Sequence, residues 1–340
     1  MLSGTQIELS EFTTMRVGGP AEVLVTPTTR EELVDAALAA WAEDDSWLVL
    51  GGGSNVVVSD AGFPGTVIRV GTRGIRRLDG DGVVLAVEAG EPWDGLVAHA
   101  VEQGWSGIEA LSGIPGSCGA APIQNIGAYG QELSDVLVAV DFLDYVTGEQ
   151  LRIPAEELEL GYRTSAIKAG RQGVVLGIEL RLEESAEGAI RYSQLANALG
   201  VESAPIAEIR AGVLQLRRSK GMVLDPADPD SVSCGSFFTN PIVSENFARS
   251  LPLETPQWLV DDTDVKLSAA WLIEKAGITR GFRLPGSHVA ISSKHTLAIT
   301  NRGGGTAEEV GELARYIRAM VLARFGLSLQ PEPVAVGVEL

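Results

Sequence analysis

Two glycine-rich segments are best suited by composition to hold a phosphate or a flat ligand. The first is Gly51-Gly52-Gly53-Ser54-Asn55, a turn between two strand-like runs. The dinucleotide-binding fingerprint needs a strand that leads into a helix, so this turn does not fit it. Free N–H groups in the bend, with the Ser54 and Asn55 side chains, could instead hold a pyrophosphate. An ordinary hairpin turn is the alternative.

The second segment runs from Gly113 to Gly130 and is long, glycine-rich and yet apolar. Gln124 and Asn125 offer donors and acceptors for an isoalloxazine ring or its phosphates. Small residues let the backbone approach a flat ligand closely, and we expect this of Gly113, Gly116, Gly119 and Gly127. A buried structural loop is the alternative.

The charge balance restricts the partners. The chain has 26 Lys and Arg against 45 Asp and Glu, a net charge of −19, which repels nucleic acid and anionic lipid. We expect neither as a partner. An acidic protein that binds phosphates must concentrate its basic groups, and Arg217-Arg218-Ser219-Lys220 is such a cluster. A solvated helix face is an equally good explanation for Arg217 and Arg218.

The cysteines and histidines predict neither disulfides nor a metal site. Cys118 and Cys234 are far apart and lack a CxxC pattern. His288 and His295 have no third ligand at metal spacing, and His99 lies in an apolar helical run. A signal peptide and an apolar run of about 20 residues are both missing, so we expect a cytoplasmic protein.

The elements that must position these segments follow an α+β pattern. Thr29 and Glu32 form a capping box before an apolar helix that reaches Trp41. A second capping box, Thr306 to Glu309, begins a helix that ends at Gly326. Alternating apolar residues predict strands over 47–50, 66–70, 75–78, 83–87, 136–145, 151–153 and 174–182. We expect 185–205 to be a looser, exposed excursion.

At 340 residues the chain exceeds one ordinary core. The change from helix–strand alternation to hairpins places a first boundary near Gly65, and returning helical signals place a second near 210. We therefore expect domains over 1–65, 66–210 and 211–326. The apolar tail 327–340, with Pro331 and Pro333, is expected to pack back on the first domain.

The two glycine segments resemble the FAD-binding half of the vanillyl-alcohol-oxidase-like flavoproteins. A fuller set of elements, in the same order, resembles the UDP-N-acetylenolpyruvoylglucosamine reductase family nearly end to end. The resemblance implies a two-subdomain FAD-binding module with a third α+β domain for substrate. Its elements are 14–19, 51–55, 113–130, Tyr162-Arg163-Thr164-Ser165, Gly235-Ser236-Phe237-Phe238-Thr239-Asn240-Pro241 and Pro331-Glu332-Pro333.

The resemblance also implies the reaction. NADPH would reduce bound FAD, and the enolpyruvyl sugar nucleotide would then accept a hydride at C3, giving UDP-N-acetylmuramate for peptidoglycan, and hence for cell shape and division. The implied partner is the sugar nucleotide, and we expect a monomer. The alternatives are another flavin oxidoreductase on the same scaffold and a sugar-nucleotide-binding protein that has lost its flavin.

Three residues match the catalytic positions of the family. Arg163 would hold the pyruvyl carboxylate as a permanent bidentate cation. Ser236 would give a proton to C2, although such a serine alone is more often a turn hydroxyl. Glu332 lies between two prolines that stiffen its backbone. It would donate a hydrogen bond to the enolate if protonated, or orient Arg163 or a water if ionised; both remain open.

Three further residues match substrate positions. Lys220 and Asn240 suit a diphosphate. Tyr192 lies in the excursion where one branch of the family has a longer loop with a tyrosine that closes over substrate. A solvent-facing tyrosine in a mobile loop is the alternative.

Overall fold

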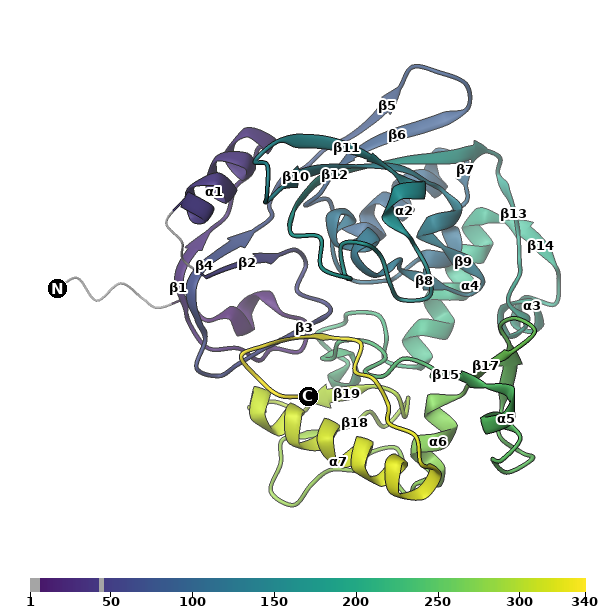
Figure 1. Cartoon of the computed structure of the whole chain (residues 1–340). Coiled ribbons are helices and arrows are strands. Elements are labelled where there is room, and N and C mark those ends of the chain that lie inside the picture. Colours follow the sequence, from purple (N-terminus) through teal and green to yellow (C-terminus); the bar gives the residue numbers. More distant parts are fainter. Residues whose placement is uncertain (1–6, 43–45) are drawn as a thin grey trace. The chain divides into compact units, whose positions relative to one another are not determined.

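The computed structural model describes residues 7–42 and 46–340, and the chain forms two compact units (Figure 1). Of the described residues, the first unit contains Ile7, Ala21–Gly53 and Pro64–Ser219. The second unit contains Glu8–Pro20, Ser54–Phe63 and Lys220–Leu340. The division into three domains with a returning tail stays a prediction.

The first unit begins with a small sheet in the order β1-β4-β2, from β1 (Ala21–Val25), β4 (Phe63–Arg69) and β2 (Trp47–Leu50). Helix α1 (Arg30–Ala42) confirms the first predicted helix. Its capping box forms as expected, because Glu32 accepts from the Thr28 and Thr29 N–H groups and Thr29 accepts from the Glu32 N–H. Strands β2 and β4 are parallel.

A larger antiparallel sheet has the order β11-β10-β12-β6-β5 (Figure 1). The predicted hairpins are confirmed as β5 with β6 and β10 with β11. Helix α2 (Trp93–Glu102) buries Trp93 in the same core, where its indole N–H donates to Leu111 O at 3.2 Å. The strands are β5 (Ile75–Leu78), β6 (Val83–Glu88), β7 (Trp105–Ser106), β10 (Leu137–Asp144), β11 (Gln150–Pro154) and β12 (Gly173–Glu184).

The stretch 185–205 is exposed over most of its length, as expected, but it is folded rather than loose. It contains β13 (Glu187–Ala189), α3 (Ser193–Leu199) and β14 (Ser203–Pro205), followed by α4 (Ile206–Ser219). These elements share a small apolar core of Ile190, Leu195, Ala204, Ile209 and Val213. Each element before α4 is too short for its periodicity to stand out from the sequence.

The second unit is built on the 19-residue helix α7 (Ala307–Phe325), which confirms the last predicted helix. Its capping box of Thr306 and Glu309 forms, and Gly326 ends it in the left-handed conformation at φ 70°. Strand β20 (Val334–Val336) of the tail pairs in parallel with β3 (Val56–Val58). The remaining elements are β15 (Ile242–Ser244), α5 (Glu245–Ala248), β16 (Gln257–Leu259), β17 (Asp264–Leu267), α6 (Ala269–Lys275), β18 (Val289–Ile291) and β19 (Ile299–Asn301).

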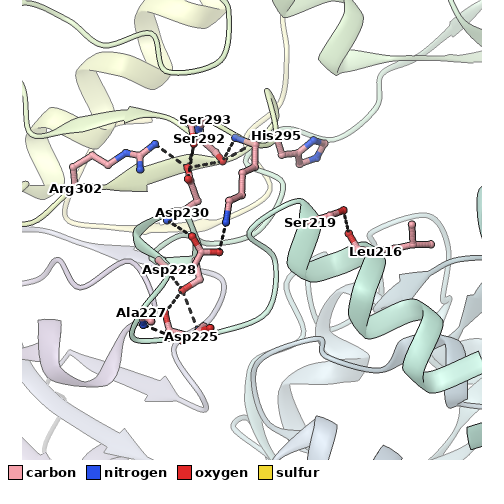
Figure 2. Close-up of polar contacts among 12 residues, drawn as sticks. Leu216, Ser219, Asp225, Ala227, Asp228, Asp230, Ser292, Ser293, His295 and Arg302 are labelled. Carbon is pink, nitrogen blue, oxygen red and sulfur yellow. Dashed lines mark hydrogen bonds and ion pairs between the residues drawn. The ribbon is translucent and has the colours of Figure 1, made fainter. Parts of the chain in front are cut away.

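A buried carboxylate fixes the segment between Lys220 and Ser236 (Figure 2). Asp230 is 3% exposed and accepts from Ser292 Oγ at 2.8 Å, Ser293 N at 2.7 Å and Arg302 at 2.8 Å. Burial alone would raise its pKa, but these donors outweigh burial and lower the pKa of Asp230 below its ordinary value. The network therefore ties this segment to strands β18 and β19.

Short 3₁₀ helices complete the fold: η1 (Leu9–Phe12), η2 (Glu109–Leu111), η3 (Cys118–Gln124), η4 (Leu133–Asp135), η5 (Ala155–Leu158) and η6 (Pro229–Ser231). The two-residue strands β8 (Gly127–Ala128) and β9 (Gln131–Glu132) form a small hairpin. No helix in the described part of the chain is long and apolar enough to cross a membrane.

Candidate active site

The two glycine segments meet in the first unit. A Cβ on Gly51 would lie 2.4 Å from Ser117 Oγ, and a Cβ on Gly52 would lie 2.6 Å from Gly116 Cα. At Gly52 the neighbouring atoms are backbone and far closer than a van der Waals contact, so only glycine lets the two main chains approach there, whereas at Gly51 the close neighbour is a side-chain hydroxyl. The segments predicted separately to hold the cofactor therefore form one surface of main chain.

The second glycine segment is anchored to the sheet and to helix α2. Gly119 N donates to Ala89 O at 2.7 Å, and Gly113 N donates to Asp94 Oδ1 at 2.6 Å. Asp94 also forms an ion pair with Arg210 of helix α4 at 2.6 Å. Burial alone would raise the pKa of Asp94, but the bonds from Arg210 and Gly113 outweigh it and lower the pKa. Asp94 is therefore an ionised anchor for the start of the segment.

Arg163 lies against the end of the same segment. Its guanidinium donates to Gly127 O at 2.8 Å and to Asn125 O at 3.3 Å. Its backbone is left-handed at φ 56°, a conformation that costs free energy in a non-glycine residue and often marks a functional position. The catalytic candidate and two cofactor candidates thus form one cluster. Gln124 lies nearby with its amide oxygen 3.5 Å from Lys168 Nζ.

Ser236 and Glu332 come together in the second unit. Glu332 N donates to Phe237 O at 2.9 Å, so the residue after Ser236 is bonded directly to Glu332. Asn55 Nδ2 donates to Glu332 O at 3.2 Å, and Val334 N donates back to Asn55 O at 3.0 Å. The end of the first glycine segment thus holds the backbone of Glu332, while Ser54 lies next to it in the chain.

Lys220 and Arg280 both place a positive charge near His295, a grouping that the sequence does not indicate. Burial, together with the positive charges of Lys220 and Arg280, lowers the pKa of His295 to about 4. His295 is therefore neutral at physiological pH and can accept or donate one hydrogen bond. Asn240 lies in the same unit, where its Oδ1 accepts from Ala269 N at the start of α6. Long sequence separations left no pattern that could have found Arg280 or His295.

Tyr192 packs beside the second glycine segment. Its ring meets that of Tyr129 edge to face, with centroids 5.5 Å apart, and Tyr129 belongs to the segment. The explanation of Arg217 as a solvated helix face was wrong, because its side chain is buried and its charge interacts with Tyr129 and Asp94. Burial lowers the pKa of Arg217. Arg218, by contrast, is exposed.

Cys118 and Cys234 are both free, buried thiols. Burial raises the pKa of Cys118, and it raises that of Cys234 to about 12. Within residues 7–42 and 46–340, no three His, Cys, Asp or Glu side chains are placed to hold a metal ion. His99 packs edge to face on Trp105 at 5.6 Å.

Comparison with known proteins gives the family. A model described as FAD binding domain matches residues 21–154, and one described as UDP-N-acetylenolpyruvoylglucosamine reductase, C-terminal domain, matches residues 226–336. A UDP-N-acetylenolpyruvoylglucosamine reductase from Leifsonia xyli subsp. xyli is 54% identical over 98% of both chains. The chain belongs to the UDP-N-acetylenolpyruvoylglucosamine reductase family. It is an FAD-dependent oxidoreductase, and this decides against a binding protein without flavin.

Two other members of the reductase family extend the comparison. The reductase from Saccharopolyspora erythraea is 50% identical over 98% of this chain and 95% of the relative. The crystal structure of UDP-N-acetylenolpyruvylglucosamine reductase from Thermus caldophilus matches with a TM-score of 0.68 and 30% identity, over 97% of this chain and 98% of the other. They confirm the predicted fold class, an α+β FAD-binding module followed by a separate C-terminal domain.

Proposed function

We propose that the protein catalyses the NADPH-dependent, FAD-mediated reduction of UDP-N-acetylglucosamine enolpyruvate to UDP-N-acetylmuramate. The overall reduction and its place in peptidoglycan synthesis follow from the family. NADPH as hydride source and the residue roles below are proposals. The observation that supports them is the backbone hydrogen bond from Glu332 N to Phe237 O at 2.9 Å, which joins the segment that carries the Ser236 hydroxyl to the segment that carries the Glu332 carboxyl.

The glycine contact in the first unit suits FAD. At the contact of Gly52 with Gly116 the two segments lie main chain against main chain, and backbone N–H groups of these segments could bind a pyrophosphate. Bound FAD supplies a hydride acceptor for NADPH and then a hydride donor for C3 of the enolpyruvyl group. We propose that the two glycine segments, including Gly53, Ser54, Gly113 and Gln124, hold it.

Arg163 acts on the substrate carboxylate. Hydride addition at C3 leaves negative charge on C2 and on that carboxylate, and a fixed guanidinium stabilises such charge. Two carbonyl acceptors, Asn125 O and Gly127 O, hold the Arg163 side chain before substrate arrives. The guanidinium therefore needs little reorganisation when the charge develops.

Ser236 gives its hydroxyl proton to C2. Gly235, at φ 72°, turns the chain immediately before Ser236, and Phe237 and Phe238 immediately after it are buried. The hydroxyl thus stands on a fixed backbone at the edge of an apolar core, and exclusion of water strengthens its interaction with a carbanion. Glu332, held by Asn55, stabilises the enolate beside it.

Lys220 and Asn240 bind the diphosphate, and Tyr192 belongs to a loop that closes over the sugar nucleotide. A basic side chain near a second cation, Arg280, and a neutral His295 suit a dianionic group. The net charge of −19 disfavours nucleic acid as a partner. We also propose that the enzyme works as a monomer in the cytoplasm.

The test separates the two halves of the reaction in Ser236→Ala. Anaerobic stopped-flow absorbance follows flavin bleaching by NADPH and flavin recovery on adding the enolpyruvyl sugar nucleotide. Loss of a general acid costs about 10²–10⁴-fold in the step that uses it, so recovery slows by that factor while bleaching stays near normal. Ser250→Ala, at an exposed serine of the same unit, is the control and leaves both steps unchanged. Equal losses in both steps of Ser236→Ala would remove Ser236 from proton transfer.

A further inference from the structure

The side chain of Asn125 is committed to bonds inside the protein. It is 1% exposed. Its amide nitrogen donates to Glu132 Oε2 at 3.0 Å, to Gly161 O at 3.1 Å and to Ser134 Oγ at 3.3 Å, and its oxygen accepts from Ser134 N at 3.0 Å. An amide so engaged has its donors and acceptor directed at neighbouring loops. The flavin is therefore a poor candidate as its partner.

One of these partners belongs to the turn that carries Arg163. Gly161 and Thr164 close this turn with two backbone bonds, of 3.2 and 3.3 Å, and Arg163 stands within it at φ 56°. The Arg163 guanidinium returns to Asn125 O at 3.3 Å. Asn125 thus contacts the Arg163 turn at two places. Its side-chain amide donates to Gly161 O, and its main-chain oxygen accepts from the Arg163 guanidinium.

The residue type at 125 suits this double role. Asn125 is itself left-handed, at φ 46° and ψ 70°, where it ends the 3₁₀ helix Cys118–Gln124. Asparagine and aspartate tolerate this conformation better than most residues. Aspartate would keep the shape and the acceptor for Ser134 N, but it would turn an oxygen toward Glu132 Oε2 and Gly161 O, which both need a donor.

We propose that the Asn125 side chain is a positioning residue for Arg163 in the substrate half of the reaction. It sets the Gly161–Thr164 turn so that the guanidinium meets the substrate carboxylate. This inference rests on the proposed role of Arg163. A displacement of about 1 Å in such a group can cost on the order of 100-fold in rate, so the amide acts on kcat of that half-reaction.

Two substitutions test it in the full-length, FAD-loaded enzyme. Asn125→Asp keeps the shape and reverses one donor, whereas Asn125→Gly keeps the left-handed backbone and removes the side chain. Both are measured for FAD content, for the rate of flavin bleaching by NADPH, and for flavin recovery against substrate concentration. We expect normal FAD content, bleaching within about twofold, and maximal recovery about 10- to 100-fold slower.

Glu132→Gln provides the rescue. The amide that it introduces can donate to the carboxylate of Asn125→Asp. Flavin recovery in the double variant should therefore be about tenfold faster than in Asn125→Asp alone, whereas a second substitution would not reverse a general loss of stability. In an Arg163→Lys background, Asn125→Gly should slow flavin recovery by less than about a further threefold, because the group that Asn125 positions is already impaired.

The outcomes separate this inference from the proposed function. Loss of FAD, or slow bleaching, in both Asn125 variants would overturn positioning in favour of a cofactor contact. Fast flavin recovery in the Asn125 variants, with slow flavin recovery in Arg163→Lys, would overturn the positioning role of Asn125 and leave the proposed role of Arg163 intact. Fast recovery in Arg163→Lys itself would overturn the proposed role of Arg163, and positioning with it.

Discussion

Replacing Gly52 with alanine perturbs the contact between the two glycine segments most directly. The new Cβ would lie 2.6 Å from Gly116 Cα and 2.9 Å from Gly116 C, whereas carbon atoms normally pack about 3.5–4.0 Å apart. Because the obstacle is backbone rather than a flexible side chain, the segments must separate by about 1 Å. Overpacking of this kind costs about 1–3 kcal/mol, and we expect the upper half of that range.

The effect should appear in FAD binding. If the contact forms the pyrophosphate surface, a loss of about 2 kcal/mol corresponds to roughly 30-fold weaker binding. The dissociation constant is measured from the recovery of free flavin fluorescence on dilution. Gly95→Ala is the matched control, because its nearest neighbour, Pro92 Cβ, is 3.6 Å away and the site is helical. It should bind FAD normally and gain about 0.5–1 kcal/mol in stability. Equal FAD affinity in Gly52→Ala and the unmodified protein would refute this reasoning.

Four more predictions concern titratable side chains and their partners. Asp230→Ala should lower the free energy of unfolding by about 3 kcal/mol, seen as a lower urea midpoint, because it leaves Arg302 and two serines without their acceptor; an unchanged midpoint would contradict the network. The lowered pKa of Asp230 also means that its contribution is complete above the unfolded pKa, about 3.9, and is lost as pH falls through the folded pKa; circular dichroism should show acid unfolding that is less steep in Asp230→Asn. His295, with a pKa of about 4, should show the NMR shifts of a neutral ring at pH 6, and a titration midpoint of about 6.5 would contradict its burial beside cations. Asp94→Asn should weaken FAD binding about tenfold by loosening Gly113, and unchanged fluorescence titrations would contradict that anchor.

The regular elements could be predicted where their sequence signals were local. Both capping boxes involve residues three positions apart, so the pattern and the structure are set by the same interactions. The elements of 185–205 could not be predicted because they are short. Their core residue Leu195 packs against residues of helix α4, a contact that no local periodicity indicates.

The candidate site shows the same difference between local signals and long-range contacts. Resemblance to the family supplied the candidate residues, but not their contacts. Asn55 and Glu332 are bonded although they are 277 residues apart, and no spacing rule anticipates such a pair. As a polar residue of the second glycine segment, Asn125 is expected to face the cofactor, whereas its bonds to Glu132 and Gly161 depend on how three loops fold together.

The proposed function requires that one flavin carries a hydride from NADPH to the enolpyruvyl sugar nucleotide. Anaerobic stopped-flow absorbance at about 450 nm, with NADPH first and the sugar nucleotide second, tests it most directly. We expect rapid bleaching by NADPH followed by full recovery of the flavin absorbance when the sugar nucleotide is added, with UDP-N-acetylmuramate formed in an amount equal to the flavin. Bleaching without recovery would contradict it, because the flavin would then deliver its hydride to a different substrate.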